Sequence, residues 1–115
     1  MTFDELLIRI PEIEVSDNAR AAHLAVIEFL RMNGYTVTPE YEVADRGDSK
    51  PGHVDIYASD GTTTVAFEID SRRPRKKSIF KLKQVDALRV IVLRNPSDKY
   101  TIPVGVDAVI GLICS

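Results

Sequence analysis

Two short segments of alternating apolar and polar residues, joined by a tight linker, constrain the fold of this chain more than any other feature. The first covers residues 53–58 and the second covers residues 63–70, with Asp60-Gly61 between them. Alternation indicates a strand with one buried face, and an Asp-Gly pair between two such strands is typical of a hairpin turn. The sequence therefore predicts an antiparallel hairpin at the centre of the fold.

Two helices are predicted before the hairpin. The capping pattern of Thr2 with Glu5 predicts a short helix that ends at Pro11. Ser16-Asp17 predicts the N-terminal cap of a second helix, in which apolar residues recur at helical spacing. Asn33-Gly34 is typical of the left-handed turn after a helix, so the second helix is expected to end there.

The remaining elements lie on both sides of the hairpin. A strand over residues 35–38 and a polar loop over 44–52 precede it, and a helix over 76–85 and strands over 89–94 and 107–113 follow it. The predicted order is helix, three strands, helix, strand and a further strand. This alternation of helices and strands predicts an α/β fold.

Length and composition limit the class of protein. With 115 residues, the chain can bury a core as a single domain over residues 1–115, without room for a second domain of ordinary size. Its one cysteine, Cys114, excludes an internal disulfide and a zinc–thiolate site. No apolar run reaches the roughly 20 residues of a membrane span. Because the N-terminus also lacks the basic start of a secretory signal, we expect a cytoplasmic protein without a membrane partner.

Positive charge is concentrated in one segment. Seven of the 15 basic residues lie between residues 72 and 83, and all 17 acidic residues lie elsewhere. The residues predicted to contact nucleic-acid phosphates are Arg72, Arg73, Arg75, Lys76, Lys77, Lys81 and Lys83. A solvated helix face is the alternative interpretation of such a run.

Acidic residues are predicted to meet on the solvent-exposed face of the hairpin, opposite the core. Side chains alternate across a strand, so Glu68 and Asp70 share a face, and Asp55 on the neighbouring strand lies within reach. Carboxylates this close repel one another unless a cation separates them, and Mg²⁺ is commonly held by one or two carboxylates. The alternative is that the acids are only the wet side of a sheet. Their position directly before the basic segment favours a metal ion beside phosphate, which is the combination that phosphodiester hydrolysis needs.

The hairpin resembles the core of the PD-(D/E)xK nuclease superfamily. The resemblance rests on the segments 52–56 (Gly-His-Val-Asp-Ile) and 65–70 (Val-Ala-Phe-Glu-Ile-Asp), and on the order of elements from about Ser16 to Leu93. It implies a restriction-endonuclease-like fold with an αβββαβ core, in which helices flank a central mixed sheet. Small resolvase-like and phage-type nucleases are the most similar members.

The resemblance also implies metal ligands. Asp55 is expected to bridge the metal, Glu68 to be the second ligand, and the backbone carbonyl of Ile69 to ligate beside them. The implied ion is Mg²⁺ or Mn²⁺. In this family the ion activates a water molecule for attack on the phosphodiester bond.

One position departs from the family pattern. Asp70 stands where the family usually has a lysine that orients water and stabilises charge. A lysine of the following helix, either Lys76, Lys77 or Lys81, is one predicted substitute, and a second metal ion bound by Asp70 is the other. The residues predicted to take part in catalysis are therefore Asp55, Glu68, Asp70, Lys76, Lys77 and Lys81.

Two histidines and a glutamate are secondary candidates. The family often has a glutamate on the first helix; His23 falls near that place and Glu28 lies five residues further on. Five residues turn a helix through about 140°, so only one of the two can face the site. His53 is interpreted as a structural residue at a loop end, with a role beside the metal as the alternative.

The resemblance implies a metal-dependent endonuclease that hydrolyses phosphodiester bonds in DNA, selects DNA by structure and acts as a homodimer. Two alternatives stand beside it. In the first alternative, the chain is a nucleic-acid-binding module on the same fold, and Asp70 marks lost activity. In the second, it is an accessory domain whose basic helix docks an acidic protein.

Overall fold

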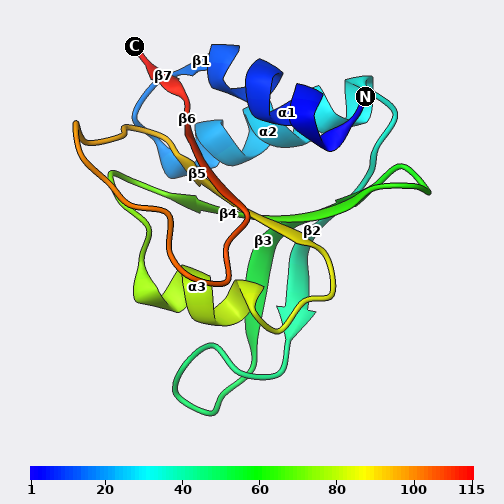
Figure 1. Ribbon diagram of the computed structural model, residues 1–115, viewed down its shortest axis with the longest axis vertical. Coiled ribbons are helices and arrows are strands. Elements are labelled where there is room, and N and C mark those ends of the chain that lie inside the picture. The colour runs from blue at the N-terminus through cyan, green and yellow to red at the C-terminus, as the bar shows by residue number, and fades with distance from the viewer.

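The computed structural model describes residues 1–115 as helices packed on both sides of a central sheet (Figure 1). The helices are α1 (Phe3–Arg9), α2 (Ala19–Met32) and α3 (Lys76–Leu82), and a 3-10 turn, η1 (Ile10–Glu12), follows α1. The strands are β1 (Glu14–Val15), β2 (Thr36–Val43), β3 (Gly52–Ser59), β4 (Thr64–Asp70), β5 (Leu88–Leu93), β6 (Ala108–Gly111) and β7 (Ile113–Cys114).

The central sheet has five strands in the order β2-β3-β4-β5-β6. The β2–β3 and β3–β4 pairs are antiparallel and the β4–β5 and β5–β6 pairs are parallel, so the sheet is mixed. Helices α1 and α2 lie on one face and α3 lies on the other, and β1 and β7 form a separate small parallel pair (Figure 1). The predicted α/β class and mixed sheet between helices are confirmed. None of the helices is long and apolar enough to cross a bilayer.

The predicted helix caps are confirmed at one helix and shifted at the other. Thr2 and Glu5 form the reciprocal capping box at the start of α1. The cap of α2 is Asn18, which accepts the N–H of Ala21, and not Ser16-Asp17. Gly34 has φ 86°, the left-handed conformation expected after the helix.

The central hairpin forms in the predicted place. Ala58 pairs with Val65 in the β3–β4 ladder, and Gly61 in the connecting turn has φ 92°. The Asp60 carboxylate accepts the backbone N–H groups of Thr62 and Thr63, which closes the turn.

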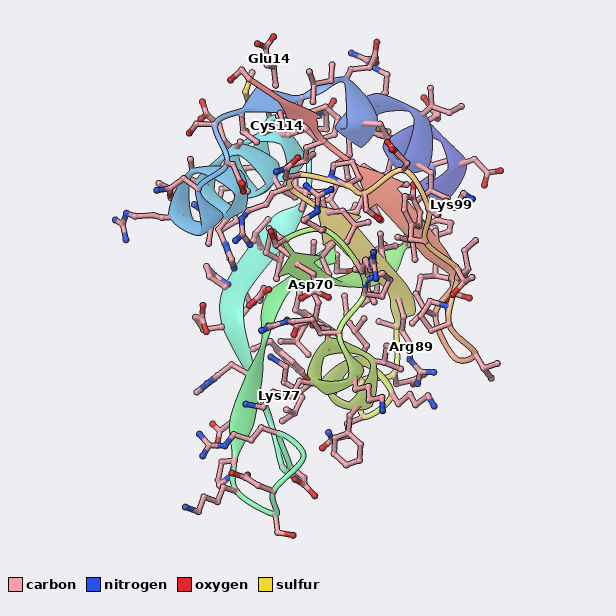
Figure 2. All side chains as sticks on the ribbon, turned by 90° about the vertical axis from the view of Figure 1, so that its left-hand side faces the viewer. Glu14, Asp70, Lys77, Arg89, Lys99 and Cys114 are labelled. Atoms are coloured by element: carbon pink, nitrogen blue, oxygen red, sulfur yellow. The ribbon has the colours of Figure 1, made fainter.

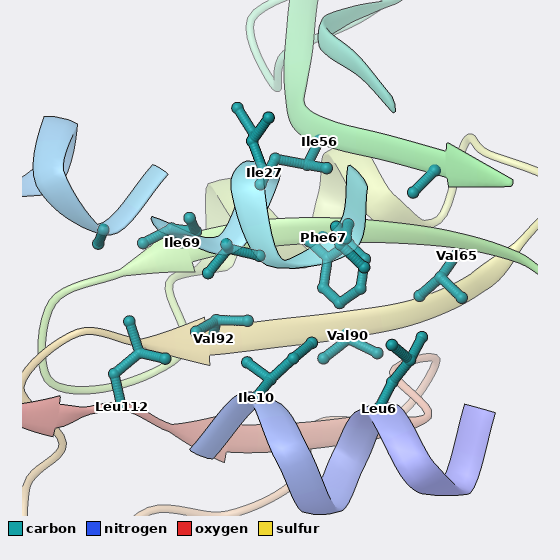
Figure 3. Close-up of a cluster of buried hydrophobic side chains, with 14 of the residues drawn as sticks. Leu6, Ile10, Ile27, Ile56, Val65, Phe67, Ile69, Val90, Val92 and Leu112 are labelled. Carbon is teal, nitrogen blue, oxygen red and sulfur yellow. The ribbon is translucent and has the colours of Figure 1, made fainter. Parts of the chain in front are cut away.

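The main core lies between the sheet and helices α1 and α2. Phe67 of β4 is fully buried there among Ile56, Val90, Leu6 and Ile10 (Figure 3). Burial of an aliphatic or aromatic side chain of this size stabilises the fold by about 1.5–3 kcal/mol. The alternating apolar residues of the hairpin therefore fix which face of the sheet receives the two N-terminal helices.

The opposite face of the sheet is covered as well. A second apolar cluster joins it to α3 and to the segment before β6, and comprises Val43, Val54, Ala66, Leu82, Val85, Ile91, Leu93, Val106 and Val109. The prediction that Glu68 and Asp70 lie on a solvent-exposed face is therefore wrong, because each side chain is only 1% exposed. Alternation shows which residues share a face, but it does not show whether a helix covers that face.

Strand β3 bends at Asp55. Val54 packs in the α3 cluster whereas Ile56 packs in the main core, although the sequence predicted one face for both. The β3–β4 pairing begins only at Ile56, and Figure 3 shows β3 changing direction beside this residue. Opposite Asp55, Glu40 of β2 has a left-handed backbone with φ 54°. The bend places Asp55 at a corner between the two layers of helices.

Candidate functional site

Asp55 at the bend of β3 contacts two other elements. Its Oδ2 accepts the backbone N–H of Ile69 at 2.7 Å, and its Oδ1 lies 3.3 Å from Nε2 of His23 on α2. Burial alone would raise the pKa of Asp55, but the hydrogen bonds from His23 and from the Ile69 N–H outweigh burial and hold the pKa below its usual value. Asp55 is therefore an anion at neutral pH.

Glu68 on β4 is the buried partner of Asp55. Its Oε2 accepts the backbone N–H of Asp55 at 2.7 Å, and its Oε1 lies 2.6 Å from Nζ of Lys81 on α3. Burial and the nearby charge of Asp55 raise the pKa of Glu68 to about 7, although the Lys81 ammonium opposes this shift. Glu68 therefore gains and loses its proton near neutral pH, in a range where an ordinary glutamate is fully ionised.

The raised pKa predicts a pH-dependent stability that Glu68→Gln removes. Because the folded pKa of about 7 exceeds the ordinary 4.5, the contribution of Glu68 to stability is complete below pH 4.5 and is lost as pH rises through 7. Urea unfolding without metal should show wild type losing about 2–3 kcal/mol relative to Glu68→Gln between pH 5 and pH 8. Mg²⁺ bound beside Glu68 should make this loss smaller, because the cation lowers the folded pKa toward the unfolded value of 4.5. Parallel stability profiles of the two proteins would contradict the assignment.

Asp70 is held by the start of α3. Its Oδ2 accepts the backbone N–H of Arg75 at 2.9 Å, and its Oδ1 accepts from Arg75 Nε at 3.0 Å and from the Ser78 hydroxyl at 2.7 Å. Figure 2 shows Asp70 in the interior, between the helices. Both carboxylate oxygens thus have protein donors, which tie the end of β4 to the first turn of α3.

The structure brings the four predicted metal ligands close to one another, but they do not all line the same cavity. Asp55, Ile69 and Asp70 line a cavity of about 300 Å³ with His23 and Arg75. Glu68 is almost fully buried and engaged by Lys81. Glu68 therefore does not line this cavity, whereas Asp70 borders it with its oxygens already bonded.

A second set of possible ligands includes a residue that the sequence did not indicate. His23, Glu40 and Asp55 each offer one ligand atom, and these atoms lie within 4.8 Å of one another. Of the two helix candidates, His23 faces the site, while Glu28 lines a different hollow beside Leu24. Glu40 was missed because only its left-handed backbone, which no pattern in the sequence reveals, turns it to this position.

The basic segment does not form one surface. Lys77 and Lys81, one helical turn apart, line a polar cavity of about 360 Å³ with Arg75, Arg46 and Asp55. No hydrophobic residue lines this cavity, and His53 lies at its edge. Three predicted phosphate ligands, Arg75, Lys77 and Lys81, thus share a space with Asp55.

The other basic residues point elsewhere. Arg73 lines a separate cavity of about 470 Å³ with Lys99, and the Lys83 side chain lies against Gly105. Arg72 and Lys76 are exposed. The helix periodicity of α3 therefore divides the run, and only part of it faces Asp55.

The site as a whole has two parts. Carboxylates gather at the bend of β3 and form an anionic corner, and a cavity lined by arginine and lysine side chains lies beside it. Such a corner can hold a divalent cation, and the cavity can hold an anion such as phosphate. No protein-family model matches the chain, and no curated protein matches it. The functional interpretation therefore rests on the residues and contacts described above.

Proposed function

We propose that the chain is a metal-dependent endonuclease with a restriction-endonuclease-like fold, which hydrolyses phosphodiester bonds in DNA using Mg²⁺ or Mn²⁺. The observation that carries the proposal is the 2.6 Å contact of Lys81 with Glu68, at the acid pair formed by Asp55 and Glu68. We therefore assign to Lys81 the role that the resemblance gives to a lysine at position 70.

The residues fit the roles that the resemblance assigns. Asp55 and Glu68, with the backbone carbonyl of Ile69, would hold the ion, which when bound would supply Lewis-acid activation of water and phosphate. Lys81 would stabilise negative charge on the phosphate as the bond breaks. The Glu68 carboxylate would move from Lys81 toward the ion, because it is attracted more strongly to a doubly charged cation than to the singly charged ammonium of Lys81.

The cavity beside the acids supports DNA as the substrate. Arg46, Arg75 and Lys77 line it together with Asp55, so a phosphate held by these cations would lie next to the proposed metal. In line with the resemblance, we also propose recognition of DNA structure rather than sequence, and a homodimer that addresses two strands.

A nicking assay on supercoiled plasmid and on branched DNA tests the proposal. Wild type should cleave with Mg²⁺ or Mn²⁺ and not with EDTA, and Asp55→Asn should lose at least about a thousand-fold in rate, because it removes the charge that both metal and water activation need. Asp98→Asn, an exposed acid in a loop, is the matched control. An inert wild type that still binds DNA would favour the non-catalytic module, and one that neither cuts nor binds would favour the protein-docking domain.

The divided basic segment predicts unequal effects on DNA affinity. Lys77→Ala should weaken duplex binding and lower the slope of log affinity against log salt by about 0.9, the value for one lost phosphate contact. Lys83→Ala should leave the slope unchanged, since its side chain lies against Gly105. Fluorescence anisotropy across a salt series measures both. Equal slopes for the two variants would mean that the cavity does not bind the DNA backbone.

A further inference from the structure

A group of three possible ligands, which does not include Glu68, lies at the bend in β3. It combines His23 of α2, Glu40 of β2 and Asp55 of β3, whose ligand atoms all lie within 4.8 Å of one another. Ligands of one metal ion with bonds near 2.1 Å lie about 3–4 Å apart. Small side-chain movements, chiefly of the exposed Glu40, would therefore close this group around an ion.

The orientation of the His23 ring indicates that a positive charge belongs at this place. Nδ1 lies 2.6 Å from the backbone carbonyl of Ala19, and because a carbonyl oxygen only accepts, Nδ1 carries the proton. In the neutral ring, Nε2 is then an acceptor, and it lies 3.3 Å from Oδ1 of Asp55, which is also an acceptor. Two facing acceptors require either a second ring proton or a cation between them.

Glu40 adds a third acceptor to this space. Its carboxylate takes part in none of the ion pairs of the molecule. Its backbone is left-handed with φ 54°, between the regular pairs Pro39–Ile56 and Tyr41–Val54 of the β2–β3 ladder. A non-glycine residue in this conformation is strained and persists where the surroundings hold it. Here the distortion occurs directly opposite Asp55.

We propose that His23, Glu40 and Asp55 bind a transition-metal ion of the Mn²⁺ to Zn²⁺ series, at a site distinct from Glu68. An imidazole nitrogen favours such ions over Mg²⁺, which prefers oxygen ligands. The hydrogen bond from Nδ1 to Ala19 fixes the ring with Nε2 toward the ion, as outer hydrogen bonds do in known metal sites. The inference shares Asp55 with the proposed nuclease site, but it does not require that the chain cleaves DNA.

Calorimetric titration with Zn²⁺ and with Mg²⁺ tests the site. A Cys114→Ser background removes the exposed thiol as a competing ligand. In this background one Zn²⁺ should bind at least ten-fold more tightly than Mg²⁺, and His23→Gln and Glu40→Gln should each weaken Zn²⁺ binding at least ten-fold. The matched control is Glu42→Gln, an exposed acid on the same strand as Glu40, which should stay within two-fold of the parent protein.

Nitrogen NMR gives an independent readout, because the chain has only two histidines. Zn²⁺ should shift the Nε2 resonance of His23 and leave both ring resonances of His53 in place. Zn²⁺ affinities that are unchanged in folded His23→Gln and Glu40→Gln would overturn the inference. A wild type that is inert on DNA but binds Zn²⁺ through His23 would remove the proposed function and leave this inference standing.

Discussion

Replacing Lys81 with Met should lower the turnover of DNA cleavage by about 10²- to 10³-fold, the usual effect of removing one group that stabilises charge in a transition state. Lys81 reaches Glu68 at 2.6 Å, and its side chain is only 15% exposed. Methionine has a similar length and fills the same space without charge. The decrease should appear in kcat under saturating DNA, because the ammonium is proposed to act on the reacting phosphate rather than on distant parts of the substrate.

Two further variants separate this role from a general loss of charge. Lys77→Met lies one turn earlier on the same face of α3 and should raise KM while kcat changes little, since Lys77 lines the cavity without contacting Glu68. Lys99→Met removes an exposed lysine from a loop and should leave both constants unchanged. Cleavage by a folded Lys81→Met protein at the wild-type rate would exclude Lys81 as the substitute for the family lysine.

Asp70→Ala should be the most destabilising single change near the site, at about 3–5 kcal/mol, with a fall in Tm of roughly 10–20 °C. The buried Asp70 carboxylate accepts hydrogen bonds from the N–H and Nε of Arg75 and from the hydroxyl of Ser78. Its removal leaves the buried Ser78 hydroxyl and the Arg75 N–H without this acceptor and detaches the start of α3 from β4, whereas the exposed Arg75 guanidinium can turn to water. Thermal and urea unfolding without metal measure the loss.

Whether Asp70→Ala lowers or raises the stability of the metal-free protein distinguishes an anchoring role for Asp70 from a role as a metal ligand. If Asp70 were chiefly a metal ligand, its removal would relieve repulsion among the acids and stabilise the metal-free protein. Ser78→Ala, which removes one of the three hydrogen bonds, should cost about 1 kcal/mol and serves as the graded comparison. A metal-free Asp70→Ala protein as stable as wild type would contradict the anchoring role. Asp70→Lys would bury an ammonium beside Arg75 and should destabilise the fold more than Asp70→Ala does.

Short sequence patterns predicted correctly those features of the fold that depend on residues close together in the chain. The turn at Asp60-Gly61, the capping box at Thr2 and the apolar face of β4 depend on residues close together in the chain, and each is present in the structure. The approach of Asp55 to Glu68 followed from the hairpin itself, because cross-strand neighbours are set by the turn. These contacts needed no knowledge of how the helices pack.

The rest depends on packing between distant segments. Burial of Glu68 and Asp70 arises because α3 covers their face of the sheet, and alternation within β4 carries no sign of that. Three lysines were equal candidates in the sequence, but the rotation of α3 against β4 brings Lys81 alone among them into an ion pair with Glu68. Glu40 depends on a left-handed backbone within a strand, which intrinsic preferences disfavour.

Because Lys81 pairs with Glu68, the metal-free chain supplies its own counterion for this buried acid. No buried side-chain nitrogen or oxygen lacks a hydrogen-bond partner, so the fold needs no ion to satisfy its buried polar groups. Purification with a chelator should therefore yield folded protein, in contrast to small domains whose folding depends on a structural metal. Under the proposed function, metal binding would be a reversible exchange on an already folded chain, in which the incoming ion displaces Lys81 from Glu68 instead of creating the fold.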